Sequence, residues 1–112
     1  MRNNIALSLA LSLLISAALS TPAWAGDAAT GKLKAEQVCQ TCHGMDGIGT
    51  MPMVANLSGQ QELYMIAQLK AYKSGKRQHE QMSIIASMLS DEDIENVATW
   101  YSGIKVTIEM PQ

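Results

Sequence analysis

The sequence predicts an all-α fold, and two observations lead to this prediction. Residues 27–42, 60–74 and 90–103 combine helix-forming residues with capping or stop signals at their ends. No segment shows the strand–helix–strand alternation of a parallel sheet, and no repeat or low-complexity stretch is present. We therefore expect about three to four helices that form one small domain.

Residues 1–25 are predicted to be a cleavable export signal. Arg2 gives the start a positive charge, residues 5–19 are mostly apolar, and Ala23-Trp24-Ala25 fits the small-x-small pattern of a cleavage site. The apolar run is shorter than the roughly 20 residues that a bilayer span needs. We expect a mature domain at residues 26–112 that is soluble and does not span the membrane, with an uncleaved anchor as the alternative.

The first helix is predicted over residues 27–42, where good helix formers follow Asp27 as a candidate N-cap. Residues 44–59 contain four glycines and a proline without sustained periodicity. Such a composition is typical of an irregular loop. The loop is expected to connect the first helix to the second.

The second helix is predicted over residues 60–74, because a broad apolar face ends at Ser74-Gly75. The last is predicted over residues 90–103. Ser90 followed by three acidic residues is a capping and dipole signal, and apolar residues then recur at helical spacing up to Gly103. Residues 104–112 are predicted to form a short tail.

Five residues at the end of the first predicted helix, Cys39-Gln40-Thr41-Cys42-His43, form the pattern C-x-x-C-H. This spacing places two thiols one helical turn apart with an imidazole directly after them, and it is the arrangement that attaches haem c. Each thiol can form a thioether with one vinyl group of the porphyrin, while His43 can bind the iron from the same side. The expected cofactor is one covalently bound haem c, attached through Cys39 and Cys42, with His43 as the proximal iron ligand.

Other uses of C-x-x-C fit this sequence less well. A thioredoxin-like redox pair would lie near a strand–helix–strand unit, which is not found here. A structural zinc site needs four ligands, and besides the two cysteines the chain offers only His43 and His79. In an oxidising compartment an unused pair of thiols would tend to form a disulfide. His79 lies in a polar stretch and is expected to be exposed, without a ligand role.

The iron also needs a donor on the side opposite His43, and methionine sulfur is one such donor. Most methionines simply fill cores. Met45 follows His43 too closely, and Met65 lies inside a predicted helix. Met82 begins a polar-to-apolar stretch just before the last helix and is the favoured candidate. The remaining candidates after residue 25 are Met51, Met53, Met88 and Met110.

Further positions extend this pattern beyond the haem motif. They are Gly31, Ala35, Gly44, Gly47, Gly49, Leu57, Ser58, Gly59, Gln60, Tyr64, Gln68, Leu69, Gly75, Lys76, Arg77, Met82, Leu89-Ser90-Asp91-Glu92-Asp93-Ile94, Trp100 and Tyr101. With these positions, residues 26–112 resemble the small bacterial class I cytochromes c, including single modules of the tandem di-haem proteins. The resemblance implies the class I cytochrome c fold, in which helices wrap around one haem.

The resemblance also implies specific contacts. The first and last helices should cross, with Gly31 and Ala35 close to Val97 and Trp100, because glycine lets backbones approach. Met82 stands seven residues before the Leu of Leu-Ser-Asp. In the family this is the position of the distal ligand.

One departure from the family concerns the loop on the His43 side. The family usually has proline where this chain has Ala55, and the carbonyl at that position accepts a hydrogen bond from the haem-ligating histidine. The carbonyl remains, but the φ restraint of proline is lost. Separately, Arg77 is a candidate partner for a haem propionate, and a solvated basic turn is an equally supported alternative.

The expected function is electron transfer in the periplasm. With His43 and Met82 on the iron, no open position remains for a substrate, so the chain is expected not to be an enzyme. Partners should be redox proteins that dock through small, transient interfaces. The candidate docking face consists of Gln40, Thr41, Met51, Met53 and Ser83.

The charge distribution excludes one class of partner. The formal net charge is −2, without the basic footprint of a nucleic-acid-binding protein. Basic residues cluster at 70–77 and acidic residues at 91–95. Most runs of this kind are solvated faces, so docking through them is the less favoured interpretation.

Two alternative functions remain open. In one, the chain is the haem subunit of a larger oxidoreductase complex, paired with a flavoprotein as in a flavocytochrome c sulfide dehydrogenase. In the other, Met82 does not bind, and five-coordinate iron binds gases or peroxide. Co-purification with a flavin-containing chain and carbon monoxide binding by the ferrous protein distinguish these alternatives from a free carrier.

Overall fold

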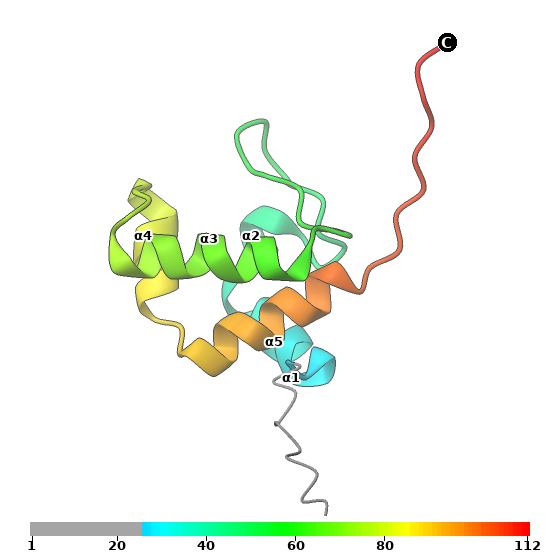
Figure 1. Cartoon of the computed structure of the whole chain (residues 1–112). Helices are drawn as coiled ribbons and strands as arrows, with labels where there is room; N and C mark the ends of the chain where they lie inside the picture. Colours follow the sequence, from blue (N-terminus) through cyan, green and yellow to red (C-terminus); the bar gives the residue numbers. More distant parts are fainter. Residues whose placement is uncertain (1–25) are drawn as a thin grey trace, which may run out of the picture.

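The computed structural model describes residues 26–112, and the predicted export signal lies outside the described residues. Within that part the structure is helical and contains no strand, which confirms the all-α prediction (Figure 1). None of the helices found there has the length and apolar character needed to cross a membrane. The helices are α1 (Ala28–Val38), α2 (Gln40–His43), α3 (Glu62–Ser74), α4 (Glu80–Ser87) and α5 (Asp91–Ser102).

The predicted first helix is wrong in one respect, because it does not run unbroken to Cys42. Asp27 caps α1 by accepting a hydrogen bond of 2.6 Å from the Thr30 N–H. The helix then ends at Val38, and Cys39, with φ −112° and ψ −37°, separates it from the single turn of α2. The break is confined to this one residue, which keeps right-handed helical angles, so the helix-forming composition does not reveal it.

Helix α4 is a second difference from the sequence prediction, which left residues 75–89 without a defined element. The helix has eight residues, and His79 forms its N-cap with side-chain hydrogen bonds to the first turn. Histidine is not among the usual capping residues, so the signal at this position is weak. In contrast, α3 and α5 lie within two residues of their predicted bounds.

Helices α1 and α5 cross at Gly31, as expected from the resemblance (Figure 1). A Cβ atom at Gly31 would lie 1.9 Å from the carbonyl oxygen of Asn96 and 3.1 Å from the nitrogen of Val97. Only glycine permits so close an approach of two backbones. The Asp27 N–H donates to Asn96 Oδ1 at 2.7 Å, which joins the start of α1 to the same part of α5.

The core lies where α3 and α1 pack against α5. It contains the buried side chains of Ala35, Met65, Ala98 and Tyr101, with Cys39 packed against them. Tyr101 and Ile94 are the largest side chains that are fully buried. Two large buried side chains form a thin core for a domain of this size, because small domains bury a modest fraction of their surface.

The charged clusters of α3 and α5 pair with each other. Lys73 Nζ lies 3.1 Å from Asp91 Oδ1, and Lys70 Nζ lies 4.0 Å from Glu95 Oε1. Exposed pairs of this kind contribute little to stability. Their mutual neutralisation favours the solvated-face interpretation over a charged docking patch.

Candidate haem site

The C-x-x-C-H motif covers the junction of α1 and α2: Cys39 lies between the two helices, and Cys42 and His43 belong to α2. The Cys39 N–H donates to the Ala35 carbonyl at 2.9 Å, and the His43 N–H donates to the Cys39 carbonyl at 3.0 Å. Cys39 and Cys42 are free and half-buried, so they form no disulfide. The turn holds the three side chains along the wall of one cavity.

The environment of Cys39 is apolar enough to keep its thiol protonated. Burial raises the pKa of this thiol to about 11, and the nearby positive charge of Lys34 offsets the increase only in part. Metal-binding cysteines react as thiolates and normally have a lowered pKa. Among residues 26–112, no three side chains of His, Cys, Asp or Glu lie together as a metal site. The described residues thus offer too few neighbouring ligands for a zinc site at this motif.

His43 is oriented by the loop that follows it. Its Nδ1 lies 2.8 Å from the carbonyl oxygen of Ala55, so Nδ1 carries the proton and donates it. This contact confirms that the carbonyl is kept without proline. The other ring nitrogen, Nε2, remains available as a ligand, and a bond of this kind raises the ligand's basicity.

Loop 44–59 is held in place by hydrogen bonds from its own residues. The Thr50 N–H donates to the Cys42 carbonyl at 2.9 Å, and the Gly49 N–H donates to Asn56 Oδ1 at 2.8 Å. The Leu57 N–H donates to the Gly47 carbonyl at 2.7 Å. Gly47 has φ +73°, and a Cβ atom there would lie 2.5 Å from the nitrogen of Ser58, so glycine is required. These bonds restrain the loop where the proline of the family is missing.

A cavity of about 780 Å³ lies between this loop and helices α3, α4 and α5. Cofactor pockets commonly have volumes of about 300–1,000 Å³ and mostly apolar walls. The wall on the motif side includes Cys39, Cys42 and His43, and the α4 wall includes Met82, Ile85 and Leu89. Residues of α3 and α5 complete it, among them Tyr64, Leu69, Val97, Ala98 and Tyr101. In volume, polarity and donor atoms the cavity fits a covalently attached haem.

Four methionines line this cavity, and they differ in their surroundings. Met65 is 6% exposed and belongs to the core, whereas Met53 is 94% exposed on the loop. Met82 is half-buried in the first turn of α4, and Met88 is 59% exposed at the end of that helix. The structure therefore places Met82 in the cavity with His43 and leaves Met45, Met51 and Met110 outside its walls.

Arg77 also reaches the wall of the cavity, but its polar contacts are within the protein. Its Nη1 donates to Gln68 Oε1 at 2.7 Å, and its guanidinium carbon lies 4.6 Å from the centroid of the Tyr72 ring. The guanidinium thus lies against the end of α3. Both contacts are with residues of α3, and the side chain of Arg77 is exposed.

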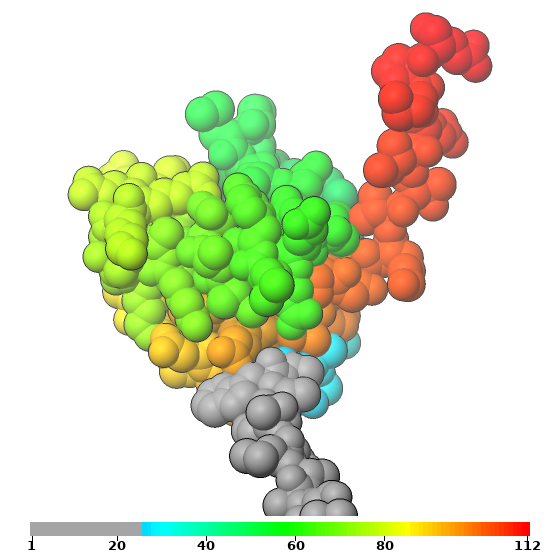
Figure 2. Space-filling view, in the orientation of Figure 1, coloured from blue at the N-terminus to red at the C-terminus, as the bar shows by residue number. Residues whose placement is uncertain are grey.

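The loop after α2 projects from the body of the molecule (Figure 2). Met51, Met53 and Ile48 are exposed on it, and Met53 also belongs to the wall of the cavity. This part of the predicted docking face is therefore accessible.

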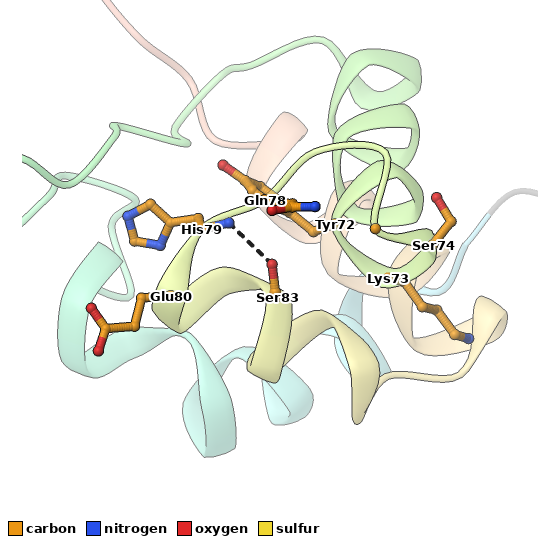
Figure 3. A pocket seen from close by; sticks show the side chains of 8 residues that line it. Tyr72, Lys73, Ser74, Gln78, His79, Glu80 and Ser83 are labelled. Atoms are coloured by element: carbon orange, nitrogen blue, oxygen red, sulfur yellow. Dashed lines mark hydrogen bonds between the residues drawn. The ribbon is translucent and has the colours of Figure 1, made fainter.

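A second hollow of about 750 Å³ lies between the end of α3 and the start of α4 (Figure 3). It contains neither a cysteine nor a methionine.

Comparison with known proteins identifies the family. A family model described as cytochrome C oxidase, cbb3-type, subunit III matches residues 26–100. The chain belongs to the cytochrome c family. Members of this family bind covalently attached haem c, and Cys39 and Cys42 of this cytochrome c stand in the C-x-x-C-H position.

Its curated relatives include proteins of two lengths. Cytochrome c4 of Pseudomonas aeruginosa is 39% identical over 103 residues, which are 91% of this chain and 51% of the relative. Cytochrome c-554(548) of Halomonas halodenitrificans is 43% identical over 81 residues, which are 70% of this chain and 96% of the relative. The chain thus spans about half the length of cytochrome c4, as predicted for one module of a di-haem protein.

The fold is similar to that of solved cytochrome c4 structures. The structure of Acidithiobacillus ferrooxidans cytochrome c4 superposes with a TM-score of 0.63 at 33% identity, covering 69% of this cytochrome c and 49% of that chain. The comparison confirms the class I cytochrome c fold.

A further relative, the thiosulfate dehydrogenase electron acceptor of Thiomonas intermedia, is 33% identical over 95 residues, or 83% of this chain and 44% of the relative.

Proposed function

We propose that this cytochrome c is a periplasmic electron carrier that holds one haem c between His43 and Met82. The observation that carries the proposal is a single cavity whose walls include both motif thiols, the imidazole and Met82. Haem c supplies an iron that cycles between the ferrous and ferric states. The export signal predicted over residues 1–25 supports the periplasmic location.

In this proposal each protein side chain has a separate task. Cys39 and Cys42 hold the cofactor through thioether bonds, which fixes its orientation relative to α2. His43 binds the iron through Nε2, because the Ala55 carbonyl engages Nδ1 and keeps the ring in one tautomer. Apolar side chains such as Leu69, Ile85 and Val97 limit the access of water to the iron.

Met82 is the best-supported distal ligand among the methionines of the cavity. Met65 is already used in core packing, and Met53 lies on the exposed loop. Met88 follows the last turn of α4 and is mostly exposed. Met82 alone among the four combines partial burial with a place in the first turn of α4. A thioether ligand raises the reduction potential, which suits an electron carrier.

The optical spectrum of the purified ferric protein tests this assignment. Methionine bound to ferric haem gives a weak far-red charge-transfer band. We expect the band in the wild type and in Met88→Ala, and its loss in Met82→Ala. A wild-type spectrum without the band would contradict His/Met ligation, and loss of the band in Met88→Ala alone would assign the ligand to that residue.

A second candidate function is that of a haem subunit in a larger oxidoreductase complex. The observation that favours it is the name of a relative, the thiosulfate dehydrogenase electron acceptor of Thiomonas intermedia. By its name, that relative accepts electrons from thiosulfate dehydrogenase. A flavoprotein such as a sulfide dehydrogenase, the partner expected from the sequence, is likewise a dehydrogenase.

Purification of the protein under native conditions separates the two functions. Stable co-elution with a larger oxidoreductase chain favours the subunit, and elution of the haem protein alone favours the free carrier. The spectrum of that chain tells whether the partner contains flavin. Rapid carbon monoxide binding by the purified ferrous protein would instead favour five-coordinate iron and a gas- or peroxide-binding function.

A further inference from the structure

The imidazole of His79 caps the helix that carries Met82 (Figure 3). Its Nδ1 accepts hydrogen bonds from the backbone N–H of Gln81 at 3.2 Å and from the backbone N–H of Met82 at 3.3 Å. His79 itself has extended backbone angles, φ −157° and ψ 135°, as an N-cap residue requires. One of the two capping bonds therefore ends on the backbone of Met82.

Two further contacts hold this cap in place. The His79 N–H donates to Ser83 Oγ at 3.1 Å, which is the dashed bond in Figure 3. The His79 ring also meets the Tyr72 ring of α3 nearly edge-on, with centroids 6.4 Å apart and an interplanar angle of 75°. The imidazole thus connects the end of α3 to the start of α4. It is exposed, as the sequence predicted, but it has a structural contact that the sequence prediction missed.

Helix α4 depends strongly on such a cap. It has eight residues, and Ala86 is its one buried residue. Helices this short are unstable by themselves in water, because few backbone bonds offset the cost of nucleation. Met82 belongs to the first turn, which is the turn that frays when the cap is lost. The position of its sulfur therefore depends on that turn remaining closed.

We propose that His79 is a positioning residue, whose cap holds the backbone of Met82 where its sulfur can reach the haem iron. The inference rests on the proposed function, because it takes Met82 as the distal ligand. The capping role needs an acceptor that reaches the second and third N–H groups of the helix. Asparagine supplies such an acceptor, and alanine does not. An asparagine at position 79 should therefore keep the capping function of His79, and an alanine there should lose it.

The test compares four haem-loaded proteins: the wild type, His79→Ala, His79→Asn and Gln78→Ala. Gln78 is the neighbouring exposed residue and serves as the matched control. Carbon monoxide binds the ferrous protein only after the distal ligand leaves, so its binding rate reports how often Met82 is detached. Loss of an N-cap corresponds to about a fivefold change in a local equilibrium. We expect His79→Ala to bind carbon monoxide about fivefold faster, with a weaker ferric far-red band.

The other variants give the controls and the contrary outcomes. His79→Asn and Gln78→Ala should keep the wild-type rate and band. If the wild type shows the band and His79→Ala binds carbon monoxide at the wild-type rate, the inference is wrong and the proposed function stands. If the wild type lacks the band, both the inference about His79 and the proposed ligation by Met82 are wrong. If His79→Ala does not retain haem, His79→Asn decides alone: a faster rate or a weakened band in that variant contradicts the capping role.

Discussion

The hydroxyl of Tyr101 in α5 donates a hydrogen bond of 2.9 Å to the carbonyl oxygen of Gly44, the residue directly after His43. The carbonyl of the same tyrosine accepts a bond of 2.9 Å from the Gly59 N–H. One residue of α5 therefore fixes both ends of loop 44–59, and this loop includes Ala55, whose carbonyl orients His43. Burial raises the pKa of the Tyr101 hydroxyl well above its ordinary value, so the group stays protonated as a donor.

Replacement of Tyr101 by phenylalanine should weaken the fold without removing the haem. The ring still fills the core, but the carbonyl of Gly44 keeps only the longer bond of 3.3 Å from the Gly47 N–H. One hydrogen bond contributes about 0.5–1.5 kcal/mol to stability, so the free energy of unfolding should fall by about that amount. Chemical unfolding of the haem-loaded protein measures the change. Tyr64→Phe, at a ring that is 49% exposed, is the control and should change little. Equal stability of Tyr101→Phe and the wild type would show that the bond is not important.

The crossing of α1 and α5 predicts a large effect of Gly31→Ala. The new methyl group would lie 1.9 Å from the Asn96 carbonyl oxygen, which belongs to rigid backbone. The two helices must then separate, and we expect a loss of about 3 kcal/mol or more, at the upper end of overpacking effects. Thermal unfolding of the haem-loaded variant measures this loss.

The matched control for Gly31→Ala is Gly75→Ala. Gly75 has φ +80° but no atom within 4 Å of the added Cβ, so its cost is backbone strain alone. Strain of this kind is about 1–2 kcal/mol. If Gly31→Ala were no more destabilising than Gly75→Ala, the close crossing would be disproved.

The elements that sequence reasoning located well are those whose signals are local. The C-x-x-C-H motif is a short pattern, and the cap of α5 is formed by neighbours: Ser90 Oγ accepts from the Asp93 N–H at 2.9 Å, and Asp93 Oδ2 accepts from the Ser90 N–H at 3.0 Å. Helix α3 carries a broad apolar face with a glycine stop. Each of these depends on residues a few positions apart, so composition and spacing reveal it.

The features that were missed depend on backbone angles or on distant segments. The break at Cys39 is confined to one residue. The bond between Tyr101 and Gly44 joins residues 57 positions apart. His79 looked like an ordinary exposed residue because its capping role appears only when the backbone of α4 is known. Long-range contacts of this kind leave no periodic pattern in the sequence.

Stability should fall in acid because aspartates at helix starts are favoured in their charged form. Partial burial tends to raise the pKa of Asp93, but hydrogen bonds from Ser90 and the charge of Lys34 outweigh it and lower the pKa below 3.8. A lowered pKa in the folded state stabilises the protein above the unfolded-state value, and this contribution is lost as the pH falls through the folded-state value. The free energy of unfolding should therefore decline below about pH 4.

Urea unfolding of wild type and Asp93→Asn between pH 7 and pH 3 checks this pH dependence. Asparagine keeps an acceptor for the Ser90 N–H but cannot ionise, so the variant should lose less stability in acid than the wild type. Glu109→Gln, in the exposed tail, controls for a general change of net charge. Parallel curves for wild type and Asp93→Asn would contradict the assignment.

The variant Ala55→Pro tests how the loop supports His43. The Ala55 carbonyl is the acceptor for His43 Nδ1, and proline keeps a carbonyl at this position. Among the described residues, none accepts a hydrogen bond from the Ala55 N–H, so proline removes no bond of the loop. Because proline restricts the unfolded chain, we expect the variant to be more stable by about 0.4–1 kcal/mol. The orientation of His43 should be unchanged, so the reduction potential and the far-red band should match the wild type. A less stable variant with a shifted potential would show instead that residue 55 adopts a backbone conformation that proline cannot, and that the hydrogen bond to His43 depends on it.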